Sequence, residues 1–398
     1  MFDMTSGVVQ VPARGFSMSY FAMLISAGLT SLFLVPSLSA QQASATPRLI
    51  PRSTQEQNRE WELHHRISLI VQVTNASGKP VTGLTREDFT ILDNQRPQPV
   101  LSFTAVNGAT ASAPPHVILV LDGVNDSSGY LAAALKGIEE LLRPQTQLPY
   151  AVSIATMTKS GLEIGGSSRS TDALSNALAV QARVLRPQSC RYDNDAYVQT
   201  MTSALPGSVS FDRSSQNPDC LNQRFVLSIA QIQKFAAHDV VVPGRDLVIW
   251  LGPGWPLLNG PGFSPDTADT KQNFFDILVD LTNGLRESQV TLYSISAPGT
   301  VDGSLRKPPS FSAVAEAADA SAATLALQRL VRQAGGLVIG EKTHISGAIT
   351  RCMADADAWY ALSFTSAPVT TVELRSIRVM VDRPGLTVRT NTEYYAEP

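Results

Sequence analysis

An uninterrupted apolar run, Val117-Ile118-Leu119-Val120-Leu121, ends at Asp122. Strands of a parallel sheet have this pattern, because helices cover both faces of such a sheet and leave no polar side. The residues that follow repeat apolar side chains at helical spacing, and Pro144 ends the repeat. A fully buried strand followed by an amphipathic helix predicts one unit of a parallel α/β sheet.

The same alternation of strand and helix continues along the chain. Further apolar strands are expected at 151–155, 247–251, 290–295 and 337–339, and amphipathic helices near 171–180, 225–236, 274–285 and 327–331. Regular alternation of this kind predicts a Rossmann-like, doubly wound parallel sheet. We assign this α/β domain to residues 114–357.

Both flanks of the α/β domain have a period of two instead. Residues 63–105 begin with Ile67, Leu69, Val71 and Val73, and residues 358–396 contain a similar alternation from Tyr360. Neither flank has enough strands to bury a face alone. The two flanks are therefore expected to pair into one small β-sandwich.

The N-terminus has the features of an export signal. Arg14 precedes an apolar stretch over residues 21–35, and small residues lead to a cleavage point after Ala40. We interpret 1–40 as a signal peptide and 41–62 as a flexible tether, with a retained membrane anchor as the alternative. Cys190 and Cys220 flank a polar stretch and are expected to form a disulfide in an oxidising compartment. The protein is therefore expected to be exported, periplasmic or extracellular, without membrane insertion after cleavage.

Composition and motifs exclude several function classes. Only 16% of the 398 residues are charged and the formal net charge is -3, which argues against a nucleic-acid partner. The five histidines have no metal-ligand spacing, and no Gly-x-Ser-x-Gly or phosphate-loop motif is present. The sequence thus gives no support for an enzyme.

Several segments form a characteristic set by their order and spacing: Gly78–Phe89, Val120–Asn125, Pro243–Leu251, Ala334-Gly335-Gly336, Trp359–Leu362, Arg383–Arg389 and Tyr394-Tyr395. Together they resemble the von Willebrand factor A-related family of acidobacterial exported proteins. The resemblance covers about residues 65–396. It implies an A-domain fold and export, with no known activity for most members.

The resemblance also implies a divalent cation site, built from an Asp-x-Ser-x-Ser loop, a threonine and an aspartate. Asp122 matches the leading aspartate, Asp126 stands in place of the second serine, and Thr171 matches the threonine. Val124 replaces the first serine, and Leu251-Gly252-Pro253-Gly254 stands where Thr-Asp-Gly is expected, so the site is degenerate. Mg²⁺ or another divalent cation is one interpretation. The alternative is that Asp126 or Ser127 caps the following helix.

A protein partner is the function that these features favour. Asn125 and Ser127 lie on the rim beside Asp122, and Trp255 and Phe263 lie on a long loop expected at the same rim. The aromatic residues could contact a partner or fix their loop to the domain. The leading hypothesis is an exported interaction module that binds at this rim. The alternative is a metal-free structural or assembly component that uses the β unit and the long loops.

Overall fold

The computed structural model describes residues 65–186, 190, 217–237, 244–258, 266–296, 312–340 and 344–398. The predicted signal peptide (1–40) and tether (41–62) lie outside these residues and stay predictions. Within the described part, no helix has the length and apolar character needed to cross a membrane.

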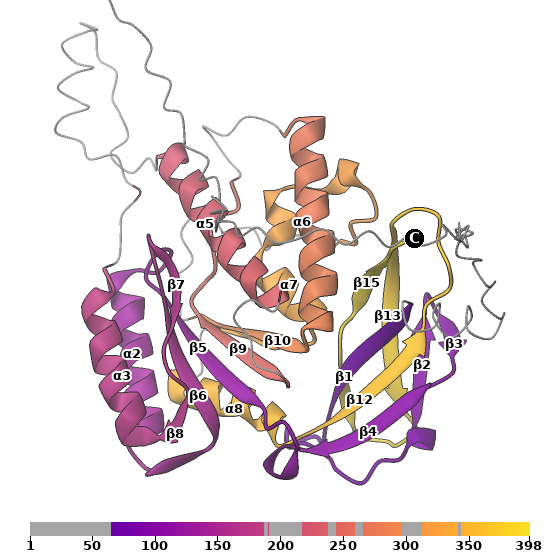
Figure 1. The fold of residues 1–398 in the computed structure, drawn as a ribbon, viewed down its shortest axis with the longest axis horizontal. Helices are drawn as coiled ribbons and strands as arrows, with labels where there is room; N and C mark the ends of the chain where they lie inside the picture. The colour runs from indigo at the N-terminus through magenta and orange to yellow at the C-terminus, as the bar shows by residue number, and fades with distance from the viewer. Residues whose placement is uncertain are drawn as a thin grey trace, which may run out of the picture. The chain divides into compact units, whose positions relative to one another are not determined.

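A mostly parallel sheet forms the centre of the α/β domain, as predicted (Figure 1). Its strand order is β11-β10-β9-β5-β6-β7, and β8 also pairs with β6. The strands are β5 (His116–Asp122), β6 (Gln147–Thr158), β7 (Gly161–Ile164), β8 (Ser168–Ser170), β9 (Asp246–Leu251), β10 (Val290–Ile295) and β11 (Val338–Ile339). Every residue of β5 is buried, which explains its continuous apolar run.

Helices cover both faces of this sheet. On one face α5 (Pro218–Ala236), α6 (Ala268–Glu287) and α7 (Leu327–Gln333) enclose a large hydrophobic cluster. On the other face α2 (Ser128–Leu142), α3 (Thr171–Val184) and α8 (Ile345–Met353) enclose a second cluster, which includes the free and buried Cys352. The doubly wound α/β fold is thus confirmed. Short 3-10 helices occupy Arg86–Asp88, Gly108–Thr110, Ala317–Asp319, Ala322–Leu325 and Ala354–Ala356.

The two flanks form the expected β-sandwich. One sheet has the order β14-β1-β12-β4 and the other β15-β13-β2-β3, so each combines strands from both ends of the chain. The strands are β1 (Arg66–Thr74), β2 (Phe89–Asp93), β3 (Arg96–Gln98), β4 (Ser102–Asn107), β12 (Ala358–Thr365), β13 (Glu373–Val381), β14 (Thr387–Arg389) and β15 (Glu393–Ala396). The alternating residues of β1 and β12 meet in one apolar cluster between the sheets.

A buried polar network joins the sandwich to the α/β domain. Asp355, which follows α8, accepts two hydrogen bonds from Arg389 of β14, at 2.6 and 2.8 Å, and one from Tyr293 of β10 at 2.6 Å. Its backbone oxygen accepts from Gln72 of β1 and from Arg245. Because Asp355 is buried, it depends on these donors, and the network fixes the two parts to each other.

Candidate functional site

The loop after β5 lies where the strand order reverses. The chain continues from β5 to β6 on one side and returns to β9 on the other side, so the carboxyl ends of β5 and β9 form the topological switch point. Ligands of open α/β sheets bind at this point. The sequence-predicted residues Asp122, Asn125, Asp126 and Ser127 all lie in this loop.

Asp122 holds the loop together by accepting four hydrogen bonds. Its Oδ1 accepts from the backbone N–H groups of Val124 and Asn125, at 3.0 and 2.9 Å. Its Oδ2 accepts from Asn125 Nδ2 at 2.8 Å and from Trp250 Nε1 at 3.0 Å. Burial raises the pKa of Asp122, and these hydrogen bonds oppose that rise. The carboxylate is therefore fully engaged with protein donors.

Asp126 is the opposite case, a buried carboxyl group that has no hydrogen-bond partner among the described residues. Both of its oxygens and the Oδ1 of Asn125 are buried without a partner. Burial, and then the charge of Asp122, raise the pKa of Asp126 well above its usual range. The carboxyl group lies against Gly252 after β9, where a Cβ atom would approach Asp126 Oδ1 to 2.7 Å. The glycine of this loop thus makes room for Asp126.

Ser127 caps the helix that follows. It is exposed, and its Oγ accepts from the backbone N–H of Tyr130, while Asp126 makes no such bond. Of the two capping residues that the sequence left open, the structure selects Ser127. Asn125 is half-buried, and its Nδ2 also donates to Ser228 of α5 at 3.0 Å.

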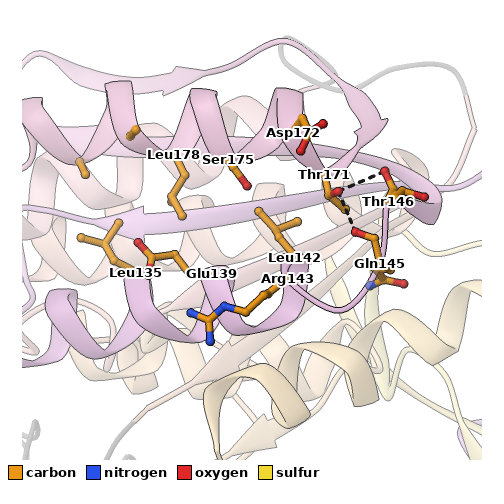
Figure 2. Close-up of a pocket in the computed structure, with 12 residues that line it drawn as sticks. Leu135, Glu139, Leu142, Arg143, Gln145, Thr146, Thr171, Asp172, Ser175 and Leu178 are labelled. Carbon is orange, nitrogen blue, oxygen red and sulfur yellow. Dashed lines mark hydrogen bonds between the residues drawn. The ribbon is translucent and has the colours of Figure 1, made fainter.

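Thr171 lies at the amino end of the parallel strands, whereas Asp122 lies at their carboxyl end. This position corrects the prediction that Thr171 lies beside Asp122. It begins α3 directly after Ser170, which pairs with Gln147 at the first residue of β6, whereas Asp122 pairs with Met157 near the last. Nearly the whole of β6, about 30 Å at roughly 3.3 Å per residue, separates them. Thr171 Oγ1 instead donates to the backbone oxygens of Gln145 and Thr146 (Figure 2). The unforeseen antiparallel strands β7 and β8 carry the chain back to this edge before α3 begins.

Figure 2 shows the groove that Thr171 helps to line, between α2 and α3. Leu135, Leu142 and Leu178 form its apolar side, and Glu139, Arg143 and Asp172 stand at its polar side. The groove has a volume of about 510 Å³. It lies away from Asp122 and does not contribute to the rim site.

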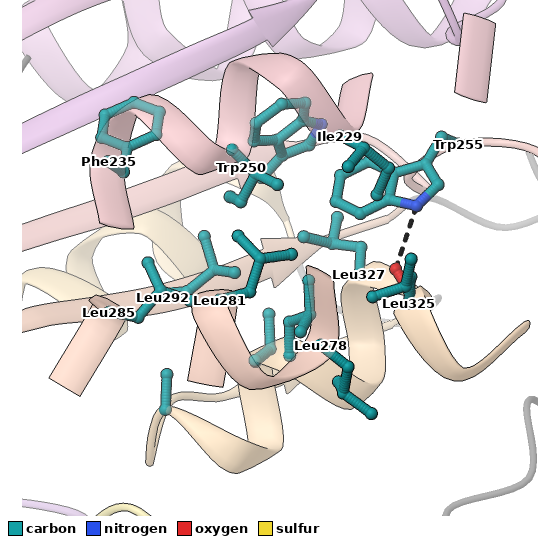
Figure 3. Packing of buried hydrophobic residues seen from close by; sticks show 14 of the residues in the cluster. Ile229, Phe235, Trp250, Trp255, Leu278, Leu281, Leu285, Leu292, Leu325 and Leu327 are labelled. Atoms are coloured by element: carbon teal, nitrogen blue, oxygen red, sulfur yellow. Dashed lines mark hydrogen bonds between the residues drawn. The ribbon is translucent and has the colours of Figure 1, made fainter. Parts of the chain in front are cut away.

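Trp255 is buried, which corrects its prediction as a partner contact. Only 1% of its surface is exposed, and its indole N–H donates to Leu325 O at 3.0 Å (Figure 3). Its ring packs edge-on against Trp250 at 5.7 Å between centroids. The buried side chain of Trp255 thus anchors the loop after β9 to the core, as the alternative interpretation held. Phe263 lies outside the described residues, and its role stays a prediction.

These residues do not fit the divalent cation site that the resemblance implies. Asp122 has no free acceptor, Val124 is packed in the core, and Thr171 is at the other edge. Only Asp126 and Asn125 present unpartnered oxygens. Within the described ranges no group of three or more His, Cys, Asp or Glu side chains is arranged to hold a metal.

A disulfide joins Cys190 to Cys220 near the start of α5. Their Cα atoms are 5.5 Å apart, and 30 positions separate them in the sequence. Asn217 caps α5 through its side chain, and its backbone N–H donates to Cys190 O. The bridge thereby fixes Cys190 to the first turn of this helix.

A second polar cluster, which the sequence did not reveal, lies at the amino end of the sheet. His116 is hydrogen-bonded through Nδ1 to Asp246 and through Nε2 to Ser153, both at 3.0 Å. The order resembles a hydrolase triad. Ser153, however, is only 1% exposed, so no substrate carbonyl can reach its hydroxyl group. The cluster links three buried polar side chains that strand order brings together.

Comparison with known proteins gives structural similarities without a family. No family model matches the chain, and no curated protein matches it. Manganese-loaded TRAP protein of Plasmodium vivax has a TM-score of 0.29 at 11% identity, over 74% of this chain and 96% of that one. An aerotolerance-related membrane protein of Bacteroides fragilis has a TM-score of 0.28 at 12% identity, over 61% of this chain and 98% of that one. The SpRpn10 VWA domain has a TM-score of 0.25 at 9% identity, over 60% of this chain and 94% of that one. Scores at this level carry no information on residues or function, and the fold class follows from the strand order itself.

Proposed function

We propose that this protein is an exported interaction module that binds a protein partner at the carboxyl rim of its parallel sheet. The supporting observation is the set of unpartnered acceptors on the loop after β5, namely Asp126 and the Oδ1 of Asn125. Buried polar atoms without partners are uncommon in folded proteins, and a functional role is one physical reason for a fold to keep them. Asn125 and the exposed Ser127 are the described residues through which a partner would reach this loop.

The disulfide supports the proposed location. A bridge between Cys190 and Cys220 persists in an oxidising compartment, which agrees with the predicted signal peptide. We place the protein in the periplasm or outside the cell. Membership of the acidobacterial exported family stays part of this proposal.

Binding at the rim is proposed to need no divalent cation. Asp122 serves as an internal acceptor for its own loop, and the raised pKa of Asp126 favours its neutral, protonated form. The same observations leave room for the alternative of a metal-free assembly component. In that case the sandwich or the long loops would make the contact, and substitutions at the rim would not change binding.

A site-specific crosslinker distinguishes these functions. A photoreactive residue in place of Ser127 is expected to capture a defined partner in the native compartment, because Ser127 is exposed at the rim. The matched control carries the same group in place of Ser175, which lines the groove between α2 and α3. Equal capture at both positions, or none at Ser127, would remove the rim as the binding surface.

Calorimetric titration tests the cation separately. Metal-stripped protein is expected to show no saturable binding of Mg²⁺, Mn²⁺ or Ca²⁺. Saturable binding that disappears in Asp126→Asn would restore a metal site in altered form, built on Asp126 and Asn125.

A further inference from the structure

A cleft opens in the β-sandwich where β13 and β14 separate. The chain runs along β13, turns at 382–386 and returns along β14, yet the two strands belong to different sheets. Between them lies a volume of about 850 Å³, lined by residues 377–381 and 386–392 together with Arg332, Gly335 and Gly336. This cleft is remote from the rim loop after β5 and independent of the function proposed there.

Among the described residues, no strand pairs with the edge of β13 that faces the cleft beyond Ser376. β15 pairs with β13 only from Glu373 to Ser376, and one further bond joins Ile377 N–H to Thr392 O at 2.8 Å. In an antiparallel ladder alternate residues point their N–H and C=O groups to the same side. The backbone N–H and C=O groups of Val379 and Val381 therefore point away from β2 and towards the cleft. The bond from Asp382 N–H to Asp88 O confirms that the other set faces β2.

Continuation of the same register would place Thr390 opposite Val379. Instead the chain leaves this register at residues 390–391, because β14 pairs with β1 of the other sheet. Thr390 is 9% exposed, and its Oγ1 has no hydrogen-bond partner although it lines the cleft. The cleft thus presents an unpaired strand edge and an unused hydroxyl group together.

The side chains that line the cleft define the chemistry of an occupant. Val379, Val388 and Leu386 form apolar walls. Arg378 is exposed at the cleft, and no described residue forms an ion pair with it. The described residues that line the cleft include no aspartate or glutamate. An occupant with apolar and acidic side chains in alternation would match these walls.

We propose that this cleft binds an extended acidic peptide segment of a partner protein, which adds as a strand to the free edge of β13. Main-chain hydrogen bonds from Val379 and Val381 would supply affinity, and alternate side chains would supply specificity. The span from Val379 to Val381 accommodates about three to five residues, roughly 10–17 Å of strand.

Fluorescence anisotropy of the full-length protein with short labelled peptides tests the proposal. The probe is acetyl-Val-Asp-Val-Asp-Val-amide, and the comparison peptide carries lysine in place of aspartate. The acidic peptide is expected to bind. Arg378→Glu is expected to weaken this binding about tenfold, because the substitution replaces an attraction for aspartate by a repulsion. Thr390→Val is expected to weaken it about fivefold through loss of one hydrogen bond. The matched control is Arg66→Glu, an exposed arginine at the first residue of β1.

Amide hydrogen exchange separates strand addition from electrostatic attraction. Saturation with the acidic peptide is expected to slow exchange at Val379 and Val381, whose N–H groups face the cleft. Three results would overturn the proposal: no binding of the acidic peptide, equal effects of Arg378→Glu and Arg66→Glu, or binding with unchanged exchange at both valines.

Discussion

Asp122 and Asp126 lie on one loop and are both buried, yet their removal should have opposite effects on stability. In Asp122→Ala the amides of Val124 and Asn125, the side chain of Asn125 and the indole N–H of Trp250 all lose their acceptor. Each buried donor left unpartnered costs about 1–3 kcal/mol. Because the loop can relax and admit water, we expect a total loss of about 4 kcal/mol.

Asp126→Ala removes a carboxyl group that has no hydrogen bond to lose. Its desolvation cost disappears with it, and only a small cavity remains beside Gly252. We therefore expect Asp126→Ala to be as stable as the wild-type protein at neutral pH, or more stable.

Urea denaturation followed by tryptophan fluorescence measures both variants, since Trp250 is buried and bonded to Asp122. The free energy of unfolding should fall by about 4 kcal/mol for Asp122→Ala and should not fall for Asp126→Ala. A similar loss in both variants would refute the reasoning. It would mean that the oxygens of Asp126 hold a group that stabilises the fold, such as a cation.

Four further outcomes follow from the same contacts. Burial beside Asp122 and Tyr130 raises the pKa of Asp126 in the folded protein. The contribution of Asp126 to stability is therefore most favourable below its pKa in the unfolded chain, and it falls as pH rises towards the pKa in the folded protein. Asp126→Asn should flatten this pH dependence of the free energy of unfolding, measured by denaturation across pH. Arg389→Met leaves the buried carboxylate of Asp355 with Tyr293 as its only donor among the described residues, and should cost about 3–5 kcal/mol in chemical denaturation. His116→Phe leaves Asp246 and Ser153 without their partner, and the same measurement should show a loss of about 2–4 kcal/mol, while an unchanged midpoint would contradict the role of this cluster. Reduction of the Cys190–Cys220 disulfide, which closes a loop of 30 positions, should lower the free energy of unfolding by about 3.6 kcal/mol in a comparison with and without reductant.

The sequence predicted most of the fold, because the periodicity of apolar residues reports directly which faces are buried. The run from Val117 to Leu121 identified the central strand, and alternation at both ends of the chain identified the strands of the sandwich. The antiparallel strands β7 and β8 were missed, since they are only four and three residues long and mostly half-buried. That omission displaced Thr171 to the wrong edge of the sheet.

What the sequence alone determined was therefore the type and order of the main elements, and the position of Asp122 at the end of a buried strand. Only the tertiary structure decided which polar groups have partners. Asp122 and Asp126 are equivalent as residue types four positions apart, but one accepts four hydrogen bonds and the other none. Trp255 and the trio of His116, Ser153 and Asp246 show the same limit, because their partners come from strands and helices that are distant in the chain. Hydrogen bonding depends on distances between such segments, and local patterns carry no information on those distances.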